Sequence, residues 1–208
     1  LLCFIILIFF GKKINSKAHL ISLPLIGLML LNSIYFLMKS MSIENFVMES
    51  KFNWMNLGEF KIDLGYYIDN VSAIMLVVVA LISFLVHLYS TEYMKGDLRY
   101  SRYYAFLGIF TFSMNGIVLA DSLIMMYIFW ELVGLSSFLL IGFWFEKKSA
   151  ASASKKAFLT NRVGDIGMFI GIMILFFNIG SFNINEIIHN LDKIEIEPSL
   201  LTIAGILV

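Results

Sequence analysis

The sequence YIFWELVGLSSFLLIGFW, residues 127–144, is an apolar run interrupted by a single acidic residue, Glu131. Its length is close to what an α-helix needs to cross the hydrocarbon core of a membrane. A carboxylate in such a run is costly to bury, whereas a leucine there would favour burial. The presence of Glu131 therefore requires a structural or functional reason.

The composition places the chain among integral membrane proteins. Of its 208 residues, 60% are hydrophobic and 14% are charged, values outside the usual range of soluble domains. The apolar residues form blocks of about twenty, without the alternation of barrel strands. We predict an all-α transmembrane bundle with five complete spans and two truncated ones. The complete spans are predicted at residues 20–38, 71–90, 104–120, 122–145 and 157–179, and the truncated ones at residues 1–10 and from 199 onward.

The loops carry charges that alternate in sign along the chain. Loops after the first, third and fifth spans, with the first residues of the sixth, hold eleven of the fifteen Lys and Arg residues and three acids. The remaining loops hold four cations and ten acids. By the positive-inside rule, the basic loops face the cytoplasm or its organelle equivalent. The amino terminus is then predicted to lie outside.

The longest connection between two predicted spans covers residues 41–67. Its apolar and polar residues alternate around Asn56-Leu57-Gly58, which favours a short β-hairpin at the outer interface. An irregular surface loop fits these residues equally well. Asp69 and Asp121 mark the outer ends of two spans and are expected to stay solvated.

Glu131 lies near the middle of its span, where an unpaired carboxylate costs at least ~2.5 kcal/mol. A cationic partner, a water-filled cavity or protonation would remove that cost, and a carboxyl group whose partner moves can gain and lose a proton. Tyr127, Gly134, Phe138 and Gly142 share its helix face, which predicts a face turned into the bundle. The alternative is a buried acid that only ties helices together.

Arg162 and Asp165 are three residues apart in the next span and are predicted to form an ion pair. Arg162 is expected near the inner interface, from where the pair could act on Glu131. A mere anchoring pair is the alternative, since arginine can snorkel to the interface. Gly167 and Gly171 form a G-x-x-x-G pattern that indicates close helix packing.

His87 lies toward the inner end of its span and could pass protons inward. A histidine that is only hydrogen-bonded at the interface is the alternative. The single cysteine, Cys3, cannot form a disulfide within this chain or hold an iron–sulfur cluster alone. No phosphate loop, metal-spaced cluster or nucleophile–base pair is found, and the dispersed basic residues argue against nucleic-acid binding.

Four longer stretches carry a resemblance to a known family. They are WELVGLSSFLLIGFWF (residues 130–145), KAFLTNRVGDIGMF (156–169), DLGYYIDNVSAIML (63–76) and HLYSTEYMKGD (87–97). Together they resemble chain 5, or subunit L, of the proton-pumping NADH-quinone oxidoreductase, respiratory complex I. The resemblance covers essentially the whole chain, which would then be the amino-terminal part of a longer protein.

The resemblance implies particular roles for four residues. The residue matching Glu131 carries protons at mid-membrane and works with a lysine on a later helix, beyond Val208. Those matching Asp165 and Arg162 belong to the same charged group, and the one matching His87 contributes to a hydrated path. Because that lysine lies outside the chain, Glu131 is expected to be protonated and neutral here.

The resemblance also implies an architecture and partners. Residues 1–68 would hold the first two spans and the outer hairpin, and residues 69–208 the first part of an antiporter-like translocating domain built on inverted repeats. The implied partners are membrane-arm subunits, the lipid bilayer and protons. NADH, flavin, iron–sulfur clusters and quinone would be bound by other subunits, with no cofactor in this chain.

The implied location is a bacterial inner or mitochondrial inner membrane. Two other functions fit the same residues: the large subunit of a multisubunit sodium/proton antiporter, and a structural membrane subunit with no transport role.

Overall fold

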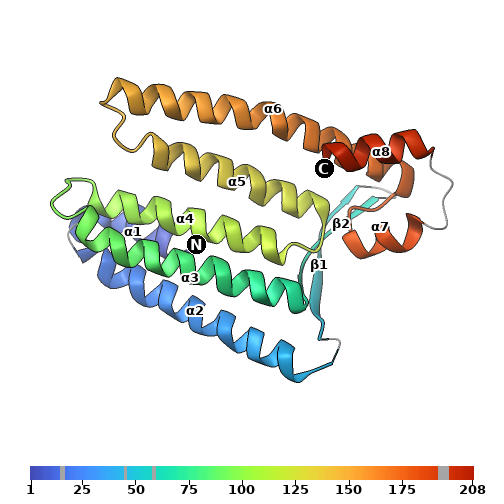
Figure 1. Ribbon diagram of the computed structural model, residues 1–208, viewed down its shortest axis with the longest axis horizontal. Coiled ribbons are helices and arrows are strands. Elements are labelled where there is room, and N and C mark those ends of the chain that lie inside the picture. The colour runs from blue at the N-terminus through green and yellow to red at the C-terminus, as the bar shows by residue number, and fades with distance from the viewer. Residues whose placement is uncertain (15–16, 45, 58–59, 192–196) are drawn as a thin grey trace.

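The computed structural model describes residues 1–14, 17–44, 46–57, 60–191 and 197–208, and these residues form a layered bundle of helices with a small hairpin at one end (Figure 1). Its helices are α1 (Leu2–Ile14), α2 (His19–Ser42), α3 (Asn70–Tyr93), α4 (Tyr100–Leu119), α5 (Leu123–Ile141), α6 (Lys148–Ile179), α7 (Ile184–Leu191) and α8 (Pro198–Leu207). Strands β1 (Met48–Leu57) and β2 (Phe60–Ile68) form the hairpin.

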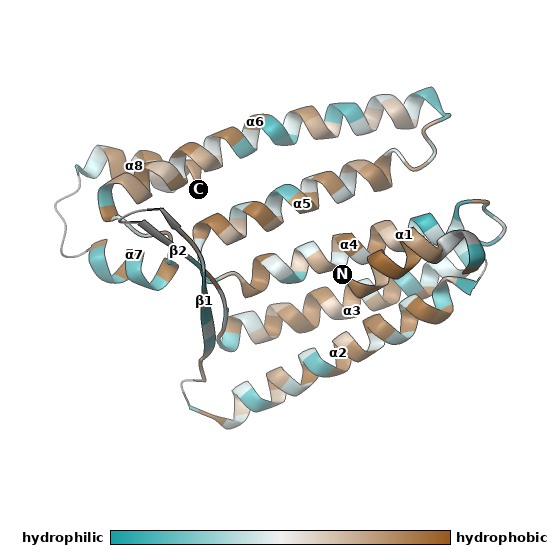
Figure 2. Ribbon diagram, turned by 180° about the vertical axis from the view of Figure 1, so that it is seen from behind, coloured by the Kyte–Doolittle hydropathy of each residue, from teal (hydrophilic) through white to brown (hydrophobic). Residues whose placement is uncertain are grey.

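Four of the helices, α2, α3, α5 and α6, are long and apolar enough to cross a membrane. They coincide with four of the five predicted complete spans, and hydrophobic residues predominate along α2, α3 and α5 (Figure 2). The helix at the fifth predicted span, α4, is 20 residues long but carries Arg102, Asn115 and several tyrosines. The helices at the two truncated spans, α1 and α8, have 13 and 10 residues.

The polar character of α4 follows from its position. It runs between α3 and α5 (Figure 1) and has more buried residues than any other described helix. Close packing is visible at two glycines. A Cβ atom added at Gly108 would lie 3.3 Å from Cys3 Sγ of α1, and one added at Gly116 would collide with the Phe129 ring of α5. A helix surrounded by other helices can carry polar groups because they need not face lipid.

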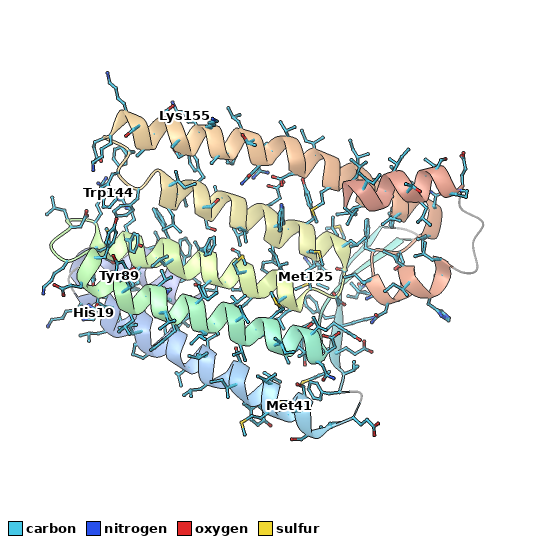
Figure 3. The ribbon with its side chains drawn as sticks, in the orientation of Figure 1. His19, Met41, Tyr89, Met125, Trp144 and Lys155 are labelled. Atoms are coloured by element: carbon cyan, nitrogen blue, oxygen red, sulfur yellow. The ribbon has the colours of Figure 1, made fainter. Side chains whose placement is uncertain are left out.

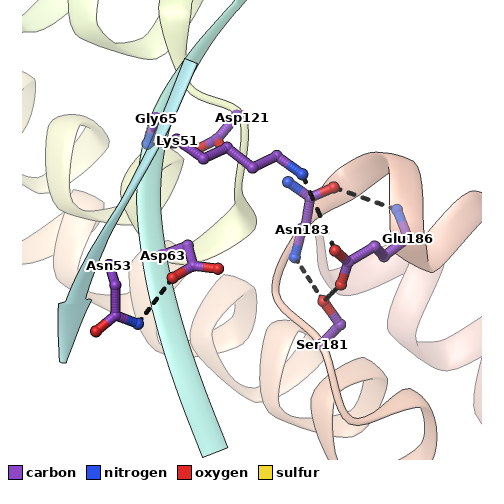
Figure 4. Close-up of polar contacts among 8 residues, drawn as sticks. All are labelled: Lys51, Asn53, Asp63, Gly65, Asp121, Ser181, Asn183 and Glu186. Carbon is purple, nitrogen blue, oxygen red and sulfur yellow. Dashed lines mark hydrogen bonds and ion pairs between the residues drawn. The ribbon is translucent and has the colours of Figure 1, made fainter. Parts of the chain in front are cut away.

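The predicted hairpin is confirmed, so the described chain is mostly helical rather than all-α. The strands pair antiparallel from Met48 opposite Ile68 to Leu57 opposite Phe60, with an irregularity between Asn53 and Met55. Gly58, predicted for the turn, lies outside the described residues. The Asn53 side chain donates a hydrogen bond of 2.9 Å to Asp63 across the strands (Figure 4).

Helix α6 begins at Lys148, nine residues before the predicted span. The added segment is rich in alanine, which has the highest helix propensity. The apolar blocks did not predict it, because its serines and lysines are polar. The helix ends at Ile179 and is capped by Gly180, whose φ of 81° is left-handed and whose N–H donates to Phe176 O at 2.7 Å.

The predicted alternation of loop charge corresponds to two ends of the bundle. The α1–α2, α3–α4 and α5–α6 connections lie together at what we call the basic end, with Lys13, Lys17, Lys95, Arg99 and Lys147 (Figure 1). The hairpin, the α4–α5 junction and α7 lie at the opposite, acidic end, with Glu49, Asp63, Asp69, Asp121 and Glu186. The charge asymmetry of the sequence is therefore an asymmetry of the folded molecule.

Candidate functional site

Three charged side chains predicted from the sequence meet between α5 and α6. Arg162 Nη1 forms an ion pair with Glu131 Oε2 and lies 3.8 Å from Asp165 Oδ2. The side chains of Glu131, Arg162 and Asp165 are 21%, 34% and 5% exposed. The predicted Arg162–Asp165 pair is confirmed, and one guanidinium is shared by two carboxylates.

The expectation that Glu131 lacks a cationic partner within this chain was wrong, because Arg162 is that partner. Arg162 also lies deeper than expected. Glu131 occupies the middle of α5, and Arg162 is near the middle of α6 because that helix starts at Lys148. The basis for predicting a neutral Glu131 is thereby removed.

Two neighbours hold the shared arginine and its acids in place. The guanidinium carbon of Arg162 lies 4.7 Å from the centre of the Phe158 ring, a distance suited to a cation–π contact. Trp130 Nε1 donates a hydrogen bond of 3.1 Å to Asp165 Oδ1. Trp130 directly precedes Glu131, so the same turn of α5 carries Glu131 and donates a hydrogen bond to Asp165.

The predicted inward stripe of α5 does face α6. The ring of Tyr127 lies 5.5 Å from that of Phe169, and the ring of Phe138 lies 5.4 Å from that of Phe158. A Cβ atom added at Gly134 would lie 3.9 Å from Arg162 Nη2. The glycine thus leaves room for the guanidinium beside Glu131.

A cleft of about 350 Å³ lies next to the charged cluster, between α5, α6 and α8. It is bordered by Trp130, Val133, Gly134, Thr160, Asn161, Gly164, Asp165, Met168, Leu207 and Val208. Its polar wall comes from Thr160, Asn161 and Asp165. The G-x-x-x-G pattern packs against α8 on the same side, because a Cβ atom added at Gly171 would lie 2.9 Å from Leu207 Cβ.

His87 is not part of this cluster. It is fully buried between α3 and α4, and its Nδ1 lies 2.7 Å from the carbonyl oxygen of Ser83. A carbonyl only accepts, so Nδ1 is the donor, and in the neutral ring Nε2 then carries the lone pair. That buried Nε2 has no partner among the described residues. Helix α4 lies between α3, which carries His87, and α5 (Figure 1), and the Tyr104 hydroxyl of α4 donates a hydrogen bond of 3.0 Å to the His87 carbonyl.

Asp121, expected to be solvated, is instead buried, with only 5% of the residue exposed. Its Oδ1 accepts a hydrogen bond of 3.1 Å from the Gly65 N–H of β2, and its carbonyl oxygen accepts one of 3.1 Å from Ile184 N–H of α7. Lys51 Nζ of β1 lies 3.9 Å from Glu186 Oε1 of α7 (Figure 4). Asp121 therefore joins the hairpin, the α4–α5 junction and α7.

Burial raises the pKa of the Asp121 carboxyl group, against the opposing effects of the Gly65 hydrogen bond and the Lys51 charge. A side chain at residue 65 would prevent this contact, because an added Cβ atom would lie 2.6 Å from Asp121 Oδ2. Sequence reasoning missed the roles of Trp130 and Asp121. The position of Trp130 beside Glu131 was an available signal, whereas the burial of Asp121 depends on segments distant in sequence.

Two parts of the chain match models of known protein families. Residues 54–104 match the family described as "NADH-Ubiquinone oxidoreductase (complex I), chain 5 N-terminus", and residues 120–208 match "NADH:quinone oxidoreductase/Mrp antiporter, TM". The second match contains Glu131, Arg162 and Asp165.

Two curated relatives are similar over most of the chain. One is the chloroplastic NAD(P)H-quinone oxidoreductase subunit 5 of Nephroselmis olivacea, 49% identical over 154 residues, which are 74% of this chain and 24% of that protein. The other is NAD(P)H-quinone oxidoreductase chain 5 of Synechocystis sp., 48% identical over 139 residues, which are 67% of this chain and 20% of that protein. The chain thus spans about a quarter or less of the length of these relatives.

Two solved structures share the fold at low sequence identity. A chain of the archaeal membrane-bound sulfane sulfur reductase superposes with a TM-score of 0.81 at 17% identity, covering 99% of this chain and 41% of that chain. A chain of the Mrp complex from Dietzia sp. superposes with a TM-score of 0.80 at 20% identity, covering 98% and 21%. From the sequence matches and the shared fold, this integral membrane protein belongs to the chain 5 branch of the NADH:quinone oxidoreductase/Mrp antiporter family.

Proposed function

We propose that the chain contributes to proton translocation in a membrane-bound NAD(P)H-quinone oxidoreductase, with Glu131 as the proton carrier at mid-membrane. The observation that carries this proposal is the sharing of Arg162 by two carboxylates on adjacent helices. With both acids ionised, the three groups carry a net charge of −1 in a region that disfavours charge. One proton neutralises the cluster, which supports an exchangeable proton at this place.

The geometry also supports a way to control that proton. Arg162 touches Glu131 and lies 3.8 Å from Asp165, so a small movement of its flexible side chain can change which acid it pairs with. When Arg162 moves toward Asp165, Glu131 loses its cation and takes up a proton. When Arg162 returns, Glu131 releases the proton. The adjacent cleft gives water a place to deliver or remove it.

The redox chemistry in this proposal belongs to other subunits. NAD(P)H oxidation and quinone reduction would occur on partners that hold the cofactors, and the energy would reach this chain through the membrane arm. By the positive-inside rule, the basic end would face the cytoplasm or its organelle equivalent.

The test is proton transport relative to electron transfer in sealed vesicles that contain the whole protein complex. Glu131→Gln keeps the shape of the side chain and removes its exchangeable proton. We expect electron transfer to quinone to continue while fewer protons move per electron. Glu186→Gln, at the exposed acidic end, is the matched control and should leave the ratio unchanged. Equal ratios for Glu131→Gln and the unaltered complex would point to the structural role.

Sodium/proton antiport is a second candidate, because the family match and one structural neighbour include Mrp proteins. The same vesicles separate the two functions. Antiport predicts proton movement driven by a sodium gradient without NAD(P)H, whereas redox-driven translocation predicts movement that follows quinone reduction and is independent of sodium.

A further inference from the structure

A second hollow of the bundle lies at its basic end, away from the charged cluster. It is a groove of about 320 Å³ between α4, the end of α5 and the start of α6. Four of its ten bordering residues are phenylalanines, and one cation lies on α4 and another on α6. The bordering residues that the proposal uses are Arg102, Phe106, Phe138, Phe143, Phe145 and Lys155.

The two cations are not neutralised by the protein. The side chains of Arg102 and Lys155 are exposed and make no hydrogen bond or ion pair within the described ranges. By contrast Arg99, one turn before Arg102, donates to both Glu146 oxygens at 2.8 and 3.2 Å. The nearby acid Asp97 accepts from Trp144 Nε1 at 3.1 Å. The groove therefore presents positive charge that an external anion can neutralise.

The cations and the phenylalanine rings of the groove follow one another along α4 and α6. Arg102 is the third residue of α4, and Phe106 follows one turn deeper. On α6, Lys155 precedes Phe158, whose ring lies 5.4 Å from the Phe138 ring of α5. Figure 3 shows Lys155 and Trp144 at the same end of the bundle. Arg102 and Lys155 thus lie nearer the basic end than Phe106, Phe138 and Phe158, an order that suits a lipid with a charged headgroup and an apolar acyl chain.

We propose that this groove binds an anionic phospholipid of the leaflet at the basic end. Its phosphate lies between Arg102 and Lys155, and one acyl chain runs inward along Phe106 and Phe138. A free phosphate ion would use the cations alone and leave the aromatic wall unused. Basic pockets between membrane helices are suited to anionic lipid headgroups. This inference does not depend on proton translocation by Glu131.

The experiment measures lipid binding to the whole protein, purified with its partner subunits and depleted of lipid in detergent. Native mass spectrometry follows the binding of added phosphatidylglycerol. The double variant Arg102→Ala with Lys155→Ala should bind about 30-fold more weakly, because each cation lost weakens binding by roughly fivefold and the two losses multiply. Lys13→Ala with Lys17→Ala removes the same charge at the same end and should bind as the unaltered protein does.

Three further arms separate the possible ligands. Phosphatidylcholine should bind much more weakly than phosphatidylglycerol, and neither inorganic phosphate nor glycerol 3-phosphate should displace the bound lipid. Arg102→Lys with Lys155→Arg should retain binding, which shows that a loss is not due to misfolding. Equal weakening by the Lys13 and Lys17 variant would mean diffuse attraction to the basic end, and displacement by phosphate would mean a soluble-anion site. Either result would overturn the proposal.

Discussion

At the scale of single residues, the decisive fact is that the mid-membrane acid of α5 has a partner within the chain. The sequence predicted Glu131, Arg162 and Asp165 as functional groups, because charges in apolar spans are conspicuous and an i,i+3 spacing identifies a pair on one helix. It could not show that Arg162 reaches Glu131, since that depends on how α5 and α6 are rotated against each other. Because the cluster contains two acids and one arginine, its net charge is −1 when both acids are ionised.

Trp130→Phe tests whether the indole N–H positions Asp165. The change keeps an aromatic ring but removes a hydrogen bond to a carboxylate, worth roughly 1.5–3 kcal/mol. We expect proton transport per electron to fall by roughly tenfold while the complex stays assembled. Trp144→Phe is the control, because it removes the same kind of bond, to Asp97, at the bundle end. Equal effects of the two variants would argue against a specific role for Trp130.

Arg162→Gln tests the shared cation. It leaves Glu131 and the buried Asp165 without a positive partner, so both acids favour the protonated form in the membrane interior. We expect proton transport to be lost even though both acids remain. The combination of Arg162→Gln with Glu131→Gln should be no worse than Arg162→Gln alone, since the two residues act as one unit. Additive losses, measured in the same vesicles, would contradict the shared-cation account.

At the scale of elements, the apolar blocks predicted the membrane helices well and the remaining structure poorly. Helices α2, α3 and α5 extend only a few residues beyond or short of the predicted ranges. The start of α6 and the short helix α7 were missed, because their polar residues do not form apolar blocks. The hairpin was recognised through its period-two pattern, but its attachment to Asp121 is a tertiary contact that no local pattern specifies.

Gly171→Ala tests the packing of α6 on α8. The new Cβ atom would lie 2.8–3.0 Å from atoms of Val208, Leu207 and Ala204, so α8 has to move. We expect a loss of roughly 1–3 kcal/mol in stability, the usual cost of overpacking, partly offset by alanine's helix propensity. Gly164→Ala is the control, because nothing lies within 4 Å of its Cβ position. Thermal unfolding of the purified protein compares them, and equal midpoints would contradict the packing.

Asp121 gives the acidic end a pH-dependent stability. Its folded-state pKa is raised by burial above the ordinary value of about 4, so the folded protein holds this proton more tightly than the unfolded chain. The stabilisation is complete below about pH 4 and is lost as the pH rises through the raised pKa. Asp121→Asn cannot titrate, so its stability should change less across that window. Thermal unfolding between pH 4 and pH 8 checks this, and parallel curves for both proteins would contradict it.

At the scale of the whole molecule, the loops whose charge alternates in sign along the sequence lie at two opposite ends of one bundle, one basic and one acidic. The sequence predicted this arrangement because successive membrane helices reverse direction and therefore place alternate loops on the same side. It could not predict the α4-centred packing, because the apolar blocks do not tell which helix is surrounded by others. Glu131 lies midway between the basic and acidic ends because it occupies the middle of α5.

Thiol labelling tests which end faces which compartment. Single cysteines at Lys17 or Lys95 report on the basic end, and single cysteines at Glu49 or Glu186 report on the acidic end. Cys3 is buried and is replaced by serine to remove its background. In intact cells or sealed organelles oriented as in vivo, an impermeant reagent should label only the acidic-end cysteines. Labelling of the basic end alone would invert the proposed orientation.

The most direct test of the central claim is an infrared difference spectrum of the whole complex, recorded as turnover is started with NAD(P)H and quinone. If Glu131 exchanges a proton during turnover, a carboxylic acid C=O band should change with turnover and shift in deuterated water. It should disappear in Glu131→Gln and persist in Glu186→Gln. A spectrum with no such band, or a band unchanged by Glu131→Gln, would contradict the assignment of Glu131 as the proton carrier.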